Sequence, residues 1–205
     1  MTQLEAPEGV TVWQVSLDTP PVSSYLSLDE QARAARFRFA RDRQRYIACR
    51  SALRLLLGEA LGIAPEAVAL TYGPQGKPEC TEFAFNVSHS DSLALIALGA
   101  EGVDIEKVRT DFDPHELGRR VFTASEFNQL RTHDDFFAIW TRKEAVIKAE
   151  GGGFSSPLLS RTVWPEPELW IAERYELVPL HPAPGYVAAL ARAKKSRQTL
   201  LSDGV

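Results

Sequence analysis

The sequence is poor in cysteine and has no long apolar run, and these two absences exclude several classes of protein. Its 205 residues include only two cysteines, Cys49 and Cys80, which lack the C-x-x-C spacing of a redox or zinc site. The longest apolar run, Leu93–Leu98, is far shorter than the roughly 20 residues that a membrane span requires. The chain also opens without a basic and then apolar leader. We therefore expect a reduced, cytoplasmic protein with no membrane partner.

The chain also has no excess of positive charge, although one segment is rich in arginine. The net charge is −4 and the pI is about 5.6, which argues against general binding to nucleic acid. Between residues 33 and 54, however, eight arginines accompany a single acidic residue, Asp42. Such charge runs are usually solvated helix faces, and the alternative is that one or two of the arginines hold an anionic ligand.

The first part of the chain predicts a strand followed by two helices. The strand is expected at residues 10–16, and Ser27 with Glu30 forms the capping box of the first helix. The second helix is expected over residues 42–61, where it buries an apolar stripe, exposes its arginines and ends at Gly62. The stripe consists of Tyr46, Cys49, Leu53, Leu57 and Ala60.

The rest of the chain alternates again between strands and helices. A second capping box begins at Thr123, and a long helix is expected over residues 135–150, ended by the glycines at 151–153. Trp140 on this helix is expected to be a packing residue. Strands are expected at residues 68–72, 84–87, 93–98, 169–177 and 186–192.

This order of elements predicts an α+β protein in which two comparable halves meet near residues 99–102. With 44% hydrophobic residues the chain can bury a core in each half. An N-terminal subdomain is expected over residues 1–101 and a C-terminal one over residues 102–193. Residues 194–205 lack apolar periodicity and are expected to form a flexible tail.

The side chains that point most clearly to a chemical function are three carboxylates and a lysine. Asp104 and Glu106 alternate with apolar residues in an extended segment, so both carboxylates lie on one face of the strand. Glu144 and Lys148 are four residues apart on the predicted helix and therefore share one face of it. Carboxylates grouped in this way suit a hard divalent cation such as Mg²⁺. Taken by themselves, Asp104 and Glu106 could also be solvated acids at a sheet edge. Glu144 and Lys148 could likewise form an ordinary helical ion pair.

Four short motifs in a fixed order carry a resemblance to a known family. They are GKP at 76–78, FNVSHS at 85–90, GVDIE at 102–106 and WTRKEAVIK at 140–148. In this order and spacing the sequence resembles the 4′-phosphopantetheinyl transferases, specifically their long, monomeric Sfp-type branch. The resemblance implies two similar α+β subdomains related by a pseudo-twofold axis, with coenzyme A in the cleft between them. It also implies an Mg²⁺-dependent transfer of phosphopantetheine to a serine of an apo acyl or peptidyl carrier protein, with release of adenosine 3′,5′-bisphosphate.

The same resemblance implies roles for individual residues. Asp104, Glu106 and Glu144 would hold Mg²⁺, and Glu144 would also act as the base toward the serine hydroxyl of the carrier. Lys148 would contact the diphosphate of coenzyme A and support the leaving oxygen. Tyr72 departs from the family pattern, because some relatives carry a second basic residue there. The residues implied in binding the coenzyme phosphates are Arg33, Arg45, Lys77, Ser88 and His89.

Two other functions would use the same features differently. A magnesium-dependent hydrolase of nucleotides or diphosphates would use the three carboxylates and turn over coenzyme A with no carrier present. A nucleic-acid-binding module would use the arginine-rich helix, and its affinity would fall steeply with salt. The acidic net charge disfavours the second function, so we expect a monomer that binds no nucleic acid. His89 lacks the partners of a hydrolase triad. Fatty-acid, polyketide and nonribosomal-peptide carriers all remain open as partners.

Overall fold

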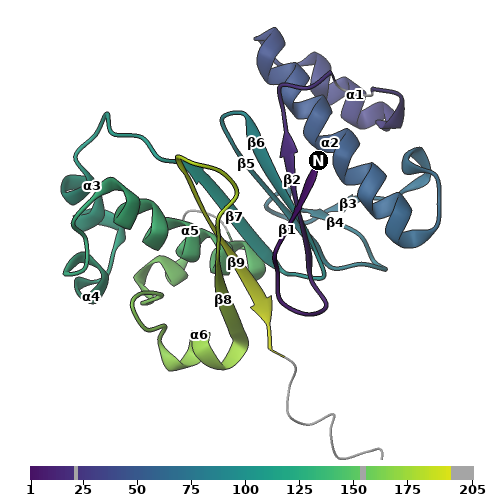
Figure 1. Cartoon of the computed structure of the whole chain (residues 1–205). Coiled ribbons are helices and arrows are strands. Elements are labelled where there is room, and N and C mark those ends of the chain that lie inside the picture. The colour runs from purple at the N-terminus through teal and green to yellow at the C-terminus, as the bar shows by residue number, and fades with distance from the viewer. Residues whose placement is uncertain (21–22, 153–155, 195–205) are drawn as a thin grey trace, which may run out of the picture.

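The computed structural model describes residues 1–20, 23–152 and 156–194 and shows an α+β protein in two halves that lie side by side (Figure 1). None of the helices described is long and apolar enough to cross a membrane. The predicted tail falls largely on residues 195–205, and the last of the three predicted glycines is Gly153. Both lie outside the described residues.

The strands form two main sheets and a small hairpin. The strands of the first half are β1 (Thr2–Leu4), β2 (Thr11–Ser16), β5 (Phe85–Ser90) and β6 (Leu93–Leu98), and those of the second half are β7 (Gly102–Lys107), β8 (Tyr175–Leu180) and β9 (Tyr186–Ala193). The hairpin consists of β3 (Thr71–Tyr72) and β4 (Pro78–Glu79). The α-helices are α1 (Leu28–Ala35), α2 (Ala40–Leu61), α3 (Pro114–Val121), α4 (Ala124–Phe127), α5 (His133–Ala149) and α6 (Leu169–Arg174). Short 3₁₀-helices are η1 (Ser23–Tyr25), η2 (Pro65–Ala67) and η3 (Pro157–Ser160).

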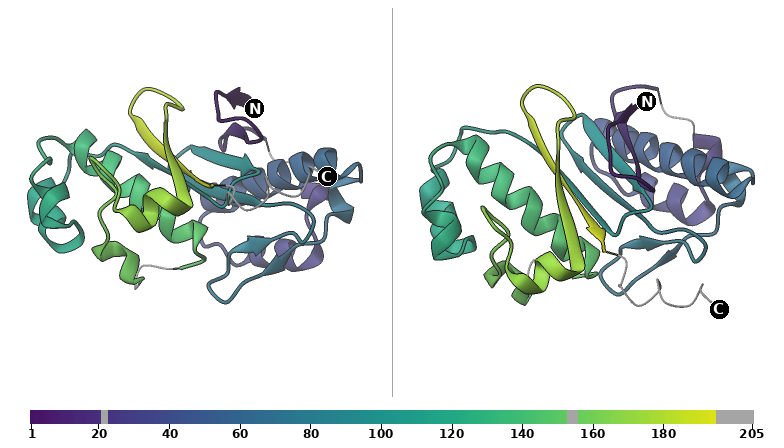
Figure 2. Two further views of the ribbon diagram at one scale, coloured as in Figure 1. Left: turned by 90° about the horizontal axis from the view of Figure 1, so that it is seen from below. Right: turned by 60° about the horizontal axis from the view of Figure 1, so that its bottom comes forward.

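The two halves repeat one arrangement of a strand, helices and an antiparallel hairpin (Figure 2). In the first half β2 is followed by α1, α2 and the hairpin β5–β6, and the sheet has the order β1-β2-β6-β5. In the second half β7 is followed by α3 to α6 and the hairpin β8–β9, and the sheet has the order β7-β9-β8. In each half the second strand of the hairpin lies between its hairpin partner and the strand that begins the repeat: β6 lies between β2 and β5, and β9 lies between β7 and β8. This repeat confirms the prediction of two similar α+β subdomains, while their limits at residues 101 and 102 stay a prediction.

The central strand β6 joins the cores of the two halves. All six of its residues are buried, because the strand is covered on both faces. Its even-numbered residues pack with Leu53 and Leu57 of α2, and its odd-numbered residues pack with Val103 and Leu190 of the second half. The second half has its own core beneath α5, where Trp140 packs with its ring 6.4 Å from that of Phe136. The packing role expected for Trp140 is thus confirmed.

The ends of the helices follow the local sequence closely. Both predicted capping boxes are present, at Ser27 and at Thr123, and each bonds the backbone N–H groups of the cap residue and of the glutamate three residues later. α5 begins at His133, slightly before the predicted start, because Thr132 caps it through a third box. Gly62 ends α2 as predicted, in a left-handed conformation with φ at 68°.

The prediction that α2 exposes its arginines was wrong for Arg50 and Arg54. The side chain of Arg54 is 3% exposed, and its Nε lies 2.6 Å from Oε2 of Glu30 on α1. Its guanidinium also donates to the carbonyl oxygens of Pro65 and Val68. Nε of Arg50 lies 3.4 Å from the other carboxylate oxygen of Glu30. These two arginines therefore fix α1 on α2, a role that helical periodicity could not show because the partner is 24 residues away in the chain.

Two predicted strands also needed correction. Residues 169–177 do not form one strand, since α6 occupies Leu169–Arg174 and β8 begins at Tyr175. The helix places Ile171 in the core beneath α5, and the helix-forming residues that follow it favour this choice. The strand expected at residues 68–72 is reduced to Thr71–Tyr72, because Val68 is the buried C-cap of η2.

Candidate active site

Three acidic side chains form an acid cluster where the two halves meet: Asp104 and Glu106 on β7, and Glu144 on α5. Asp104 is 4% exposed and Glu144 is 8% exposed, whereas Glu106 is half-buried. Burial raises the pKa of Glu144 to about 7, and the negative charge of Asp104 adds to the rise. The same two causes raise the pKa of Glu106. The carboxylates thus repel one another within one weakly solvated site.

Lys148 lies one turn after Glu144 on α5 and brings a positive charge into the acid cluster. Its Nζ lies 2.6 Å from Oδ1 of Asp104, and it donates to Oγ of Ser88 at 2.8 Å and to the carbonyl of Val103 at 3.3 Å. The ion pair of Lys148 is therefore made across to β7. One ammonium among three carboxylates leaves an excess of negative charge when all three are ionised, which favours a bound cation.

The acid cluster has free acceptor capacity for such a cation. Oδ2 of Asp104 and Oε1 of Glu144 are buried and make no hydrogen bond within the described part of the chain. A buried carboxylate oxygen without a partner is unfavourable, and a cation would satisfy it. No group of three acidic, histidine or cysteine side chains among residues 1–20, 23–152 and 156–194 already has the spacing of a metal site. The donors nevertheless fit Mg²⁺ in kind, because this ion takes one or two carboxylates and completes its shell with water and phosphate oxygens.

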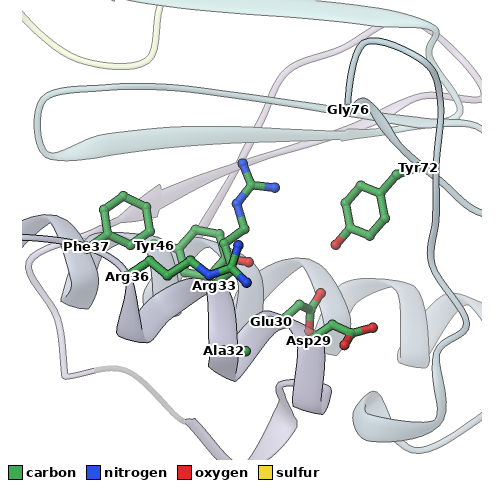
Figure 3. A pocket seen from close by; sticks show the side chains of 9 residues that line it. All are labelled: Asp29, Glu30, Ala32, Arg33, Arg36, Phe37, Tyr46, Tyr72 and Gly76. Carbon is green, nitrogen blue, oxygen red and sulfur yellow. The ribbon is translucent and has the colours of Figure 1, made fainter.

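An arginine cavity of about 480 Å³ lies between α1, α2 and one face of β5. Its lining includes Arg33, Arg45, Arg50, Tyr46 and His89. A neighbouring cavity of about 720 Å³ shares Arg33 and Tyr46 and adds Arg36 and Tyr72. Figure 3 shows this neighbour, with Tyr72 at the end of β3 facing the side chains of α1. The two cavities together present basic and aromatic groups, which suits an anionic ligand with a planar ring.

The structure places Ser88 and His89 on opposite faces of β5. His89 lines the arginine cavity together with Val87 and Asp91. Its environment lowers the pKa of its imidazole, first through partial burial and then through the charge of Lys148. Ser88 is buried on the other face, where its Oγ donates to Oδ1 of Asp104 at 2.8 Å. Neighbouring residues of a strand point to opposite sides, so only His89 of this pair lines the cavity.

Arg45 and Lys77 both have partners within the protein. The guanidinium of Arg45 lies 2.8 Å from Asp18 and 3.0 Å from Asp91, at the edge of the arginine cavity. Nζ of Lys77 donates to the carbonyl oxygens of Glu101 at 2.9 Å and Lys148 at 2.8 Å. Lys77 therefore joins the loop after β3 to the last turn of α5. Arg33, by contrast, lines both cavities and places its guanidinium 5.7 Å from the centre of the Tyr46 ring.

Sequence reasoning missed two polar residues that contact β7. Oγ of Ser90 donates to Oε2 of Glu106 at 2.8 Å, and the side-chain carbonyl of Asn86 accepts from the backbone N–H of Val103 at 2.9 Å. With Ser88 they form a polar series at every second residue of β5. That alternation was a visible signal, because it places all three side chains on one face of a strand.

Comparison with known proteins agrees with this arrangement. The family profile described as the 4′-phosphopantetheinyl transferase superfamily matches residues 101–177, and the profile for the N-terminal part of 4′-phosphopantetheinyl transferases matches residues 13–101. The chain is 37% identical to the 4′-phosphopantetheinyl transferase HetI of Nostoc sp., over 91% of this chain and 88% of that protein. It is also 37% identical to a putative 4′-phosphopantetheinyl transferase of Synechocystis sp., over 72% of this chain and 67% of that protein.

The buried carboxylates and the arginine cavity lie on the two faces of β5, and such an arrangement suits chemistry on a ligand that contains phosphate. The chain belongs to the 4′-phosphopantetheinyl transferase family. It is accordingly an enzyme that attaches phosphopantetheine to carrier proteins, with coenzyme A as the substrate of the family. The family resemblance expected from the four motifs is confirmed, while membership of the Sfp-type branch stays a prediction.

Proposed function

We propose that this enzyme transfers 4′-phosphopantetheine from coenzyme A to a serine of an apo acyl or peptidyl carrier protein, using Mg²⁺ and releasing adenosine 3′,5′-bisphosphate. The observation that carries this proposal is the buried acid cluster, whose unpartnered oxygens lie beside the ammonium of Lys148. The arginine cavity supports it, since coenzyme A is an anionic ligand that ends in an adenine ring and a 3′-phosphate. We also propose a cytoplasmic monomer, and the net charge of −4 supports the proposal that it binds no nucleic acid.

In this proposal Asp104, Glu106 and Glu144 hold Mg²⁺, which when bound offsets the negative charge of the diphosphate. Glu144 accepts the proton of the carrier serine, as a carboxylate placed within the site can do. The serine oxygen forms a bond to the phosphorus that carries the pantetheine arm. The bond from this phosphorus to the bridging oxygen of the diphosphate breaks, and that oxygen leaves with the electron pair on adenosine 3′,5′-bisphosphate. The ammonium of Lys148 stabilises the leaving oxygen.

For the coenzyme we propose that Arg33 and His89 bind the 3′-phosphate in the arginine cavity. Both line this cavity, and an arginine guanidinium binds phosphate through two parallel hydrogen bonds. Arg45, Lys77 and Ser88 already have partners within the protein, so their part in coenzyme binding is to hold the surrounding elements in place.

The activity itself is the first prediction. An apo carrier should gain the mass of one phosphopantetheine group only when the enzyme, coenzyme A and Mg²⁺ are all present, as measured by intact-protein mass spectrometry. The panel should include fatty-acid, polyketide and peptidyl carriers. Turnover of coenzyme A without any carrier would favour the hydrolase instead, and nucleic-acid binding that needs no Mg²⁺ and weakens with salt would favour the binding module. A chain that modifies no carrier on the panel would contradict the proposal.

The second prediction distinguishes the roles of Arg33 and Lys77 in binding. It compares coenzyme A with dephospho-coenzyme A, which lacks the 3′-phosphate. Charge-assisted hydrogen bonds are worth about 1.5 to 3 kcal/mol, so Arg33→Ala should weaken the binding of coenzyme A by about tenfold or more. The same variant should bind dephospho-coenzyme A nearly as well as the parent does. Lys77→Met should change the two affinities by equal factors, because its ammonium contacts backbone carbonyls.

The measurement is the Kd of each ligand by isothermal titration calorimetry, with a thermal melt of each variant as the control for folding. Equal losses for both ligands in Arg33→Ala would show that Arg33 does not bind the 3′-phosphate. A loss confined to coenzyme A in Lys77→Met would show that Lys77 does.

A further inference from the structure

The seam between β5 and β7 is built from side chains of one strand and backbone groups of the other. The two strands belong to different sheets, yet the polar side chains on one face of β5 accept the backbone N–H groups at every second residue of β7. The pairs are Asn86 with Val103 at 2.9 Å, Ser88 with Ile105 at 3.4 Å and Ser90 with Lys107 at 3.1 Å. We call these three side chains of β5 the polar seam.

Each serine of the polar seam also contacts one carboxylate of the acid cluster. Oγ of Ser88 donates to Oδ1 of Asp104 at 2.8 Å, and Oγ of Ser90 donates to Oε2 of Glu106 at 2.8 Å. These contacts follow from the period of two in both strands, since Asp104 and Glu106 share the face of β7 that meets β5. Ser88 is thus matched to Asp104, and Ser90 is matched to Glu106.

The donors around Ser88 determine where its proton goes. A hydroxyl group has one proton and two lone pairs. Oγ of Ser88 accepts from the N–H of Ile105 and from Nζ of Lys148, so both lone pairs are used and the proton is directed to Asp104. Oδ1 of Asp104 is thereby engaged, and Oδ2 is the buried oxygen without a partner. The hydroxyl of Ser88 and Nζ of Lys148, which lies 2.6 Å from Oδ1, therefore orient the carboxylate together and leave Oδ2 free.

We propose that Ser88 and Ser90 are positioning residues that orient Asp104 and Glu106 for the divalent cation. This inference rests on the proposed function, because the cation belongs to that proposal. It assigns separate tasks to the two faces of β5: Val87 and His89 line the arginine cavity on one face, while Ser88 and Ser90 hold the carboxylates on the other. Hydrogen bonds of this kind around metal ligands typically change metal affinity by about 10-fold to 100-fold when they are removed.

The test measures binding of Mn²⁺, used as a probe for Mg²⁺, to the full chain without carrier or coenzyme. Ser90→Ala should weaken Mn²⁺ affinity by about 10-fold to 100-fold in electron paramagnetic resonance titrations, and Ser90→Thr should restore most of it by returning the hydroxyl. Ser92→Ala is the matched control, because its hydroxyl contacts the hydroxyl of Tyr186 at 3.2 Å and no member of the acid cluster. This control should bind Mn²⁺ as the parent does.

A double-mutant comparison separates positioning from a general loss of structure. In a Glu106→Gln background, Ser90→Ala should cause little further loss of Mn²⁺ affinity, because the carboxylate that it orients is already gone. Ser90→Ala that binds Mn²⁺ like the parent would overturn the inference, as would equal losses in the two backgrounds. A parent chain that binds no Mn²⁺ would instead overturn the metal site of the proposed function, and the positioning role with it.

Discussion

Replacing Glu144 with glutamine is expected to lower kcat by about 100-fold to 10,000-fold even at saturating Mg²⁺, the range that a positioned base contributes. The substitution removes one ligand of the proposed cation together with the group that accepts the proton of the carrier serine. Excess Mg²⁺ should compensate for the weaker ligand but cannot supply a base. Glutamine keeps the size of the Glu144 side chain, but its amide cannot accept the proton.

The measurement is a titration of kcat with Mg²⁺ for Glu144→Gln beside Asp104→Asn and Glu106→Gln. The last two variants are the comparison, because Asp104 and Glu106 are proposed only to hold the cation. Glu106→Gln should chiefly raise the Mg²⁺ requirement and recover partly with excess metal. If high Mg²⁺ returned Glu144→Gln to the parental kcat, Glu144 would be a ligand alone, and the base would have to be a water molecule or a group of the carrier.

Replacing Gly102 with alanine is expected to lower the free energy of unfolding by about 3 kcal/mol or more, the upper part of the range for overpacked sites. A Cβ atom at this position would overlap the carbonyl oxygen of Ala145 and lie 2.9 Å from the backbone nitrogen of Ala149. Both belong to the last turns of α5, so the start of β7 and the end of α5 could not keep their present separation. Since these two segments carry Asp104 and Lys148, activity should fall with stability.

The measurement is the thermal midpoint of Gly102→Ala, which should fall by roughly 6 to 12 °C for a chain of this size. Gly73→Ala is the matched control, because its added Cβ would lie 2.7 Å from the flexible side chain of Glu79, which can turn aside, while the carbonyl oxygen of Lys77 is at an ordinary contact distance of 3.8 Å. A midpoint for Gly102→Ala close to that of Gly73→Ala would show that α5 and β7 separate easily at this contact.

The local sequence determined much of the fold, because helix caps and helix ends depend on interactions between residues only a few positions apart. The caps at Ser27 and Thr123 and the stop at Gly62 involve only neighbours within one turn, and all three were predicted. The apolar run at residues 93–98 likewise indicated a buried strand, and all six residues of β6 are buried. α6 was missed because a six-residue segment shows too little periodicity to separate helix from strand.

The sequence by itself also determined which residue types carry the chemistry. Asp104 and Glu106 share a strand face, and Glu144 and Lys148 share a helix face, because side-chain direction follows from strand and helix geometry alone. Only the tertiary structure decided what these groups meet. Packing α5 against β7 directs Lys148 to Asp104, and the junction of the two sheets gives Ser88 and Ser90 their carboxylates. Such contacts join segments 16 to 44 residues apart, and their energies depend on burial and charge that exist only once the two halves have come together.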